Sequence, residues 1–196
     1  MPFTMKRPMI SVFCGSRTGV SPRHAEDADA LGREIAAQGA GLIYGGGRIG
    51  LMGILADAVL EAGAPVYGVI PAGLADKELA HRGLTRLDVV ATMHERKARM
   101  SEHAAGFIAL AGGFGTLDEF FEIVTWKQLG HHERPIVLLN GSGFWAPLLQ
   151  VFENMSKEGF VNAAPPFGIE QTPADAVRRV LAGQRPAAGI LTASAR

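Results

Sequence analysis

The sequence predicts an α/β fold of three layers, a mainly parallel sheet with helices on both faces. Short, uninterrupted apolar runs alternate with segments of helical periodicity along almost the whole chain. Such runs are typical of strands buried on both faces, as in parallel sheets. A length of 196 residues suits one domain with one hydrophobic core. We expect that domain to cover 1–184 and to be followed by a flexible tail at 185–196.

The elements can be placed in chain order. Short apolar runs bounded by turn residues predict strands at 9–14, 41–44, 65–70, 107–110 and 135–139, the last clear strand. Helical patterns predict helices at 22–38, 49–62, 93–105, 117–129, 144–157 and 174–181. Two of the helices begin with a capping box, Thr92 with Glu95 and Thr116 with Glu119. A polar segment at 72–83 leads to an apolar-rich stretch at 84–91.

Composition excludes several classes of function. Nineteen basic residues balance nineteen acidic ones, so no basic excess points to nucleic acid. A single cysteine, Cys14, excludes an internal disulfide framework and a multi-cysteine zinc site, and it fits a reducing compartment. No apolar stretch approaches the roughly 20 residues of a membrane span. We therefore expect a cytoplasmic protein without a bound metal and without nucleic-acid or membrane partners.

Glycine is the unusual component, at 25 of 196 residues. Three glycine-rich turns, at 14–19, 45–50 and 111–116, each follow a strand and open a helix. Ligands of open α/β sheets bind at the carboxyl ends of strands, and helix N-termini attract anions. Any one turn can equally be a tight connection in a compact fold, but three together favour a phosphorylated ligand. Ser16, Gly46 and Gly47 are therefore expected to contact substrate.

Two other classes of nucleotide site fit poorly. The turn at 45–50 formally matches G-x-G-x-x-G, which in dinucleotide enzymes requires an acidic residue about 20 positions further on. The chain has Val69, Ile70 and Pro71 there, and the turn follows the second strand rather than the first. No G-x-x-x-x-G-K-[ST] motif supports a Walker-type NTPase.

Arg96 and Glu119 are the candidate reactive residues. Arg96 lies early in a helix and at helical spacing from methionines, where a bound anion would offset its unfavourable position, although solvated basic patches are common. Glu119 suits the capping box, but it also opens a helix directly after the third glycine turn. A carboxylate there could reach the sugar of a nucleotide and assist glycosidic cleavage.

Three motifs together resemble the Lonely Guy (LOG) family: 45–53, 93–97 and 112–119, with further likeness around 125–130. The likeness runs from about Ile10 to Val161 and departs from the family's PGGxGTxxE pattern at Ala111, which replaces its proline. Members of this family are cytokinin riboside 5′-monophosphate phosphoribohydrolases, often mislabelled as lysine decarboxylases. The departure leaves the glycines of the motif in place.

The resemblance implies a Rossmann-like fold and a homodimer with its active site near the subunit interface. It implies no metal or organic cofactor. It also implies that Arg96 and Glu119 are the catalytic pair. The substrate contacts that it implies are Glu78, Lys97, Gly113, Phe114, Gly115, Thr116, Leu117, Asp118 and Thr125.

The expected reaction is hydrolysis of the N-glycosidic bond of a nucleoside 5′-monophosphate, either AMP or an N6-prenylated relative, to free base and ribose 5-phosphate. Two other classes stay open. One is a non-catalytic carrier of a nucleotide or a nucleotide-like cofactor. The other is a decarboxylase dependent on pyridoxal phosphate, which needs a Schiff-base lysine that the sequence does not place in a recognisable setting.

Overall fold

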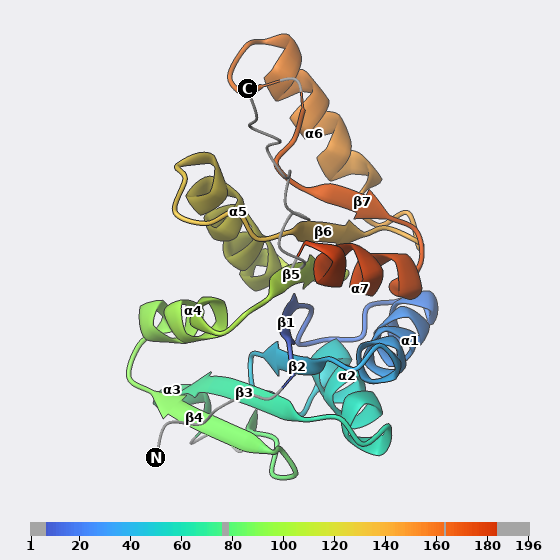
Figure 1. Cartoon of the computed structure of the whole chain (residues 1–196), viewed down its shortest axis with the longest axis vertical. Helices are drawn as coiled ribbons and strands as arrows, with labels where there is room; N and C mark the ends of the chain where they lie inside the picture. The colour runs from blue at the N-terminus through green and yellow to red at the C-terminus, as the bar shows by residue number, and fades with distance from the viewer. Residues whose placement is uncertain (1–6, 76–78, 163, 184–196) are drawn as a thin grey trace, which may run out of the picture.

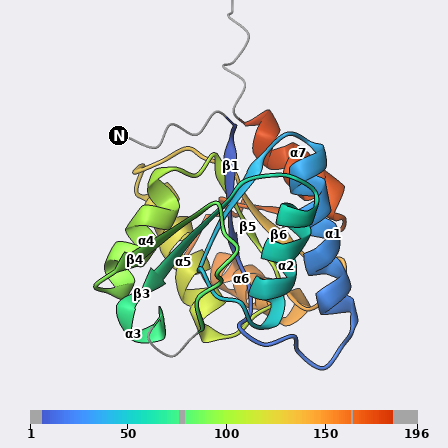
Figure 2. The ribbon, with the colours of Figure 1, turned by 90° about the horizontal axis from the view of Figure 1, so that it is seen from below.

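The computed structural model describes residues 7–75, 79–162 and 164–183. Seven parallel strands form one sheet in the order β4-β3-β2-β1-β5-β6-β7, with helices on both faces (Figures 1 and 2). The expected three-layer α/β fold is therefore confirmed. The tail expected at 185–196 lies outside the described residues.

All five expected strands form, and the sheet gains one more at each edge. The strands are β1 Met9–Phe13, β2 Gly41–Tyr44, β3 Val66–Pro71, β4 Arg86–Val90, β5 Gly106–Ala109, β6 Ile136–Leu139 and β7 Gly168–Glu170. The expectation that 135–139 is the last strand was wrong, because β7 pairs with β6 beyond it. Strands β4 and β7 are edge strands with exposed apolar residues, Val89 and Ile169, and they lack the continuous apolar run of a central strand.

The helices lie close to their expected positions, with one informative difference. They are α1 Arg23–Ala37, α2 Gly50–Glu61, α3 Ala72–Leu74, α4 Met93–Glu102, α5 Phe114–Gln128, α6 Ala146–Lys157 and α7 Pro173–Ala182. The Thr92 cap of α4 is confirmed, since its hydroxyl accepts a hydrogen bond from the Glu95 amide at 3.1 Å. The second capping box is wrong, because α5 already begins at Phe114 with Gly113 as N-cap. Thr116 and Glu119 therefore lie inside the helix.

The sheet separates two hydrophobic clusters. Helices α1, α2 and α7 cover one face, and α4 and α5 cover the other (Figure 2). Helix α6 packs against the second cluster through the partly buried Leu148, Leu149 and Phe152. Side chains alternate along each strand, so Ile10 and Val12 of β1 join the first cluster while Met9 and Phe13 join the second. Since both faces of the sheet are covered, ligands can reach it chiefly at the ends of its strands.

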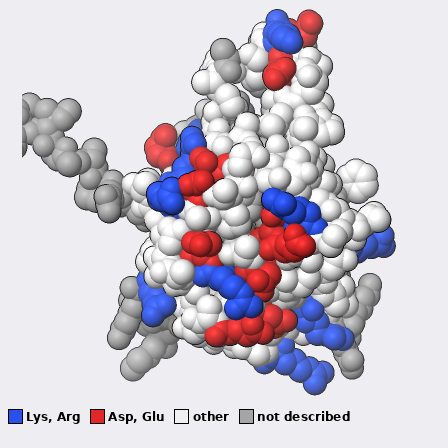
Figure 3. Space-filling model, turned by 90° about the vertical axis from the view of Figure 1, so that its right-hand side faces the viewer, with Lys and Arg blue, Asp and Glu red and all other residues white. Residues whose placement is uncertain are grey.

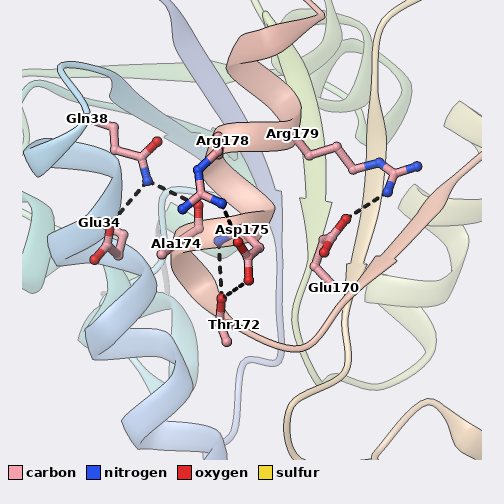
Figure 4. A network of polar contacts seen from close by, with 8 residues as sticks. All are labelled: Glu34, Gln38, Glu170, Thr172, Ala174, Asp175, Arg178 and Arg179. Atoms are coloured by element: carbon pink, nitrogen blue, oxygen red, sulfur yellow. Dashed lines mark hydrogen bonds and ion pairs between the residues drawn. The ribbon is translucent and has the colours of Figure 1, made fainter.

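Polar contacts hold α7 against the end of α1 and against β7 (Figure 4). The side-chain amide of Gln38, the C-cap of α1, donates to the Glu34 carboxylate at 3.0 Å and to the Ala174 carbonyl at 3.1 Å. Arg179 of α7 donates to Glu170 of β7 at 2.7 Å. These contacts connect the last described helix to both the first helix and the edge strand.

The surface over α1 and α2 carries acidic and basic groups side by side rather than in blocks (Figure 3). Arg33, for example, donates to both Asp29 and Glu61. Among the helices of the described residues, none has the length and apolar character that crossing a membrane would require.

Replacing Gly32 with Ala tests the close packing of α1 on α2. A Cβ at Gly32 would lie 2.7 Å from the Ala58 Cβ and 2.8 Å from the Leu55 carbonyl oxygen. We expect Gly32→Ala to lower the free energy of unfolding by about 1–3 kcal/mol, despite the better helix propensity of alanine. The matched control is Gly115→Ala in α5, where nothing lies within 4 Å. Urea denaturation that shows equal changes for the two variants would contradict this packing.

Candidate active site

The three glycine-rich turns lie together at the carboxyl ends of the central strands, as the sequence predicts. Strand β1 lies between β2 and β5, so the turns that follow these strands are neighbours. The Gly15 amide donates to the Ala111 carbonyl at 3.0 Å, and the Leu51 amide donates to the Gly15 carbonyl at 3.1 Å. The chain continues from β1 to β2 on one side and reaches β5 on the other only later. This arrangement is the switch point at which open α/β sheets bind ligands.

A cavity of about 700 Å³ lies between the first and third turns. Three of the expected substrate contacts line it: Ser16, Gly113 and Phe114. Its other lining residues are Gly15, Arg17, Thr18, Gly19, Val20, Ser21, His24, Leu51, Ala111, Gly112 and Phe144. The cavity is large enough to receive a small ligand.

Arg96 and Glu119 form a buried ion pair between α4 and α5. The Arg96 Nη1 atom lies 2.6 Å from Glu119 Oε1, and the two residues are 9% and 6% exposed. Arg96 Nε also donates to the Val69 carbonyl oxygen of β3, at 3.1 Å. Each buried charge therefore has the partner that makes its burial tolerable. The two residues expected to be the catalytic pair are in direct contact.

Two glycines in the turns leave room for side chains of the site. A Cβ at Gly45 would lie 1.9 Å from Arg96 Nη2, and one at Gly112 would lie 2.1 Å from Thr116 Oγ1. These positions therefore lack a side chain because Arg96 and Thr116 occupy the space. Sequence analysis missed this role, because spacing along the chain carries no signal of contacts between distant segments.

The turn after β2 is covered rather than open. Gly46 and Gly47 are buried, and the His81 amide donates to the Gly46 carbonyl at 2.9 Å. The Arg48 amide donates to the Leu79 carbonyl at 2.8 Å, so segment 79–81 lies over the turn. Gly46 and Gly47 do not line the cavity, and their contact with substrate stays a prediction.

A second set of charges connects the same two helices. Lys97 Nζ lies 3.1 Å from Asp118 Oδ2 and 3.1 Å from Glu122 Oε1. Burial alone would lower the pKa of Lys97, but the hydrogen bonds of Asp118 and Glu122 outweigh it and raise that pKa. Lys97 therefore stays cationic and holds α4 against α5 beside the Arg96–Glu119 pair.

The remaining predicted contacts are scattered. Thr116 is buried beside Gly112, Leu117 packs against the second core cluster, and Gly115 has open space around it. Thr125 is exposed and lines a different groove, of about 540 Å³, between α5 and α6. Glu78 lies outside the described residues.

Burial raises the pKa of two groups here, one in the pair and one beside it. It raises the pKa of the Glu119 carboxyl, and the charge of Arg96 opposes that shift. A carboxyl group with a raised pKa suits proton transfer near neutral pH. Burial also raises the pKa of the Cys14 thiol, and the charge of Glu119 adds to the effect. Cys14 is therefore a neutral thiol and a poor nucleophile.

No group of three or more His, Cys, Asp or Glu side chains that could hold a metal ion occurs in the part of the chain that the structure describes.

Replacing Gly45 with Ala tests the packing of the ion pair. The new methyl group must displace the Arg96 guanidinium and leave Glu119 without its partner. We expect Gly45→Ala to lower the free energy of unfolding by about 3 kcal/mol. Gly113→Ala is the control, because nothing lies within 4 Å of that position. Chemical denaturation showing a Gly45→Ala variant as stable as the control would refute the role assigned to Gly45.

The raised pKa of Glu119 also makes stability depend on pH. The folded state retains the Glu119 proton above the ordinary value of 4.5, at which the unfolded chain releases it. Folding stability must therefore fall as the pH rises from about 4.5 through the raised pKa of the folded state. Glu119→Gln removes this titration, so the wild type should lose stability relative to the variant across that range. Thermal melts at a series of pH values measure the difference. An exposed control is Glu158→Gln, and a difference that stays flat or shrinks would contradict the assignment.

Comparison with known proteins identifies the family. The family model described as "Possible lysine decarboxylase" matches residues 52–177. A cytokinin riboside 5′-monophosphate phosphoribohydrolase of Rhodococcoides fascians is 49% identical over 156 residues, 79% of each chain. Another, from Arabidopsis thaliana, is 43% identical over 162 residues, which cover 83% of this chain and 76% of the relative.

Solved structures share the fold at low identity. The molybdenum cofactor (Moco) carrier protein of Chlamydomonas reinhardtii has a TM-score of 0.70 at 22% identity, covering 90% of this chain and 99% of that one. The molybdenum cofactor binding protein of Rippkaea orientalis has a TM-score of 0.70 at 20% identity, covering 91% and 98%. Likeness at this level of identity concerns the fold alone. The sequence matches establish the family: the chain belongs to the LOG family, whose model is described as a possible lysine decarboxylase.

Proposed function

We propose that this protein is a phosphoribohydrolase that cleaves the N-glycosidic bond of a nucleoside 5′-monophosphate and releases the free base and ribose 5-phosphate. The observation that carries the proposal is the buried Arg96–Glu119 pair, whose arginine lies directly against Gly45 of the second glycine-rich turn. The names of the relatives indicate the substrate class, cytokinin riboside 5′-monophosphates. AMP and N6-isopentenyl-AMP are therefore the substrates to test.

The N-terminus of α5 suits the phosphate group. Gly113 is its N-cap, and the amides of the first helical turn have no partner within the helix. In our proposal these amides and the Thr116 hydroxyl hold the 5′-phosphate. Positions 116 and 119 lie on one face of a helix, three residues apart. A phosphate at the first turn therefore directs the ribose toward Glu119.

The chemistry then follows from charge. As the bond between C1′ and the base nitrogen breaks, positive charge develops on the ribose ring. The Glu119 carboxylate stabilises that charge and takes a proton from the water whose oxygen bonds to C1′. That proton then passes to the nitrogen of the leaving base, which regenerates the carboxylate. Arg96 orients Glu119 and balances its charge through the contact at 2.6 Å.

A decarboxylase dependent on pyridoxal phosphate, which the description of the family model suggests, finds less support. A Schiff base requires a neutral lysine amine. Lys97 is tied to Asp118 and Glu122, and Lys127 donates to the Arg134 carbonyl at 3.0 Å. Lys157, at the end of α6, lines the separate groove of about 540 Å³ and not the cavity between the glycine-rich turns. Lys6 and Lys77 lie outside the described residues.

We also propose that the protein is a cytoplasmic homodimer. The single cysteine supports the compartment. Phe121 and Phe152 line the groove that contains Thr125, and a second copy of the chain covering this groove would remove apolar surface from water. Light scattering at several protein concentrations tests the dimer, and a monomer at every concentration would exclude it.

Base release is the decisive assay for the function. We expect the wild type to release base from AMP or N6-isopentenyl-AMP, and Glu119→Gln to lower kcat by about 10²–10⁴-fold, because proton transfer at C1′ is lost. Chromatography of the products measures both. Glu102→Gln, an exposed change at the end of α4, serves as a control that should keep the activity.

Folded wild-type protein that releases no base from either nucleotide would exclude the proposed reaction, and binding of AMP without release would favour the carrier function. Full turnover by Glu119→Gln would exclude only the role of Glu119.

A further inference from the structure

The charged lining of the cavity between the first and third turns is entirely basic. Among the described residues that line it, Arg17 and His24 are the titratable side chains, and none is Asp or Glu. The chain as a whole carries equal numbers of acidic and basic residues. The lining of this cavity therefore differs from the chain as a whole, because it holds basic side chains without carboxylates. Such a lining favours an anionic ligand.

His24 is held in a fixed position beside this cavity. Its ring packs edge-on against Phe144, with 5.4 Å between centroids and 81° between planes. A Cβ at Gly19, whose φ is +77°, would lie 2.8 Å from its Cδ2 atom, so the turn lies closely against the ring. Its Nδ1 atom is buried and has no hydrogen-bond partner among the described residues. Because packing already positions this imidazole at the cavity wall, it can bind a ligand at little entropic cost.

Arg17 lies on the same turn, directly after Ser16. The backbone of this turn is fixed against Gly50, where a Cβ would lie 2.4 Å from the Arg17 amide nitrogen. Gly50 has a φ of +62°, which favours glycine. Arg17 is exposed and lines the cavity, and the planar guanidinium group matches the geometry of a phosphate.

We propose that Arg17 and His24 bind the 5′-phosphate of the substrate together with the α5 N-terminus. Gly113, the N-cap of α5, lines the same cavity, and His24 lies in the first turn of α1. The positive ends of both helix dipoles therefore add to the two basic side chains. This assignment rests on the proposed function for the identity of the nucleotide. It adds two side chains to a phosphate site that the glycine turns alone would make from backbone amides.

Direct binding separates this proposal from catalysis. Calorimetry with ribose 5-phosphate and with ribose, on the full chain, should show binding of the phosphorylated sugar alone. Arg17→Gln and His24→Gln should each weaken the binding of ribose 5-phosphate about tenfold, equivalent to about 1.4 kcal/mol. In turnover, each variant should raise the KM for AMP while kcat changes less than about threefold. Arg23→Gln is the matched control, since Arg23 lies beside His24 in α1, pairs with Asp27 and does not line the cavity.

His24→Phe distinguishes ligand binding from packing, because it keeps a ring against Phe144 and removes both nitrogens. If a folded His24→Phe variant binds ribose 5-phosphate as tightly as the wild type, the role of His24 is packing and the proposal fails. It also fails if Arg17→Gln behaves like Arg23→Gln, or if the wild type does not bind ribose 5-phosphate. Tight binding without base release would instead refute the proposed reaction and leave this phosphate site standing.

Discussion

The buried ion pair between Arg96 and Glu119 constrains the rest of the site. Neither charge could be buried alone, because an unpaired charge in a protein interior costs several kcal/mol. The pair therefore requires α4 and α5 to lie side by side at the ends of the central strands. It also requires the Val69 carbonyl as a further acceptor and a position without a side chain at Gly45. One ion pair thus connects helices α4 and α5 with strand β3 and with the glycine-rich turn at Gly45.

The abundance of glycine has two physical origins that composition cannot separate. Gly113 and Gly115 have open space around them and leave the start of α5 accessible. Gly45 and Gly112, by contrast, give up the volume that Arg96 and Thr116 fill. Approach of a ligand and approach of a protein side chain impose the same requirement on the backbone, so the same residue type serves both.

Periodicity predicted the central elements well and the edges poorly. Strands such as β1 and β6 are buried along their whole length and largely apolar because both of their faces are covered, whereas β4 and β7 are partly exposed and carry no such run. The Thr92 cap was predicted correctly, but the similar pattern at Thr116 was not a cap, because α5 starts three residues earlier than expected, at Phe114. A capping pattern indicates a helix near its N-terminus, while the position of the first turn depends on what the preceding residues contact.

The sequence by itself determined the α/β class, the alternation of helices and strands, and the presence of three glycine-rich turns at strand ends. These features depend only on local periodicity and local residue type. Tertiary structure decided which turns stay open, that Arg96 meets Glu119, that Thr125 lies in a separate groove, and that Arg17 and His24 share one cavity. These facts depend on the order of strands in the sheet, which brings distant segments together. Spacing along a single chain carries no information about such contacts.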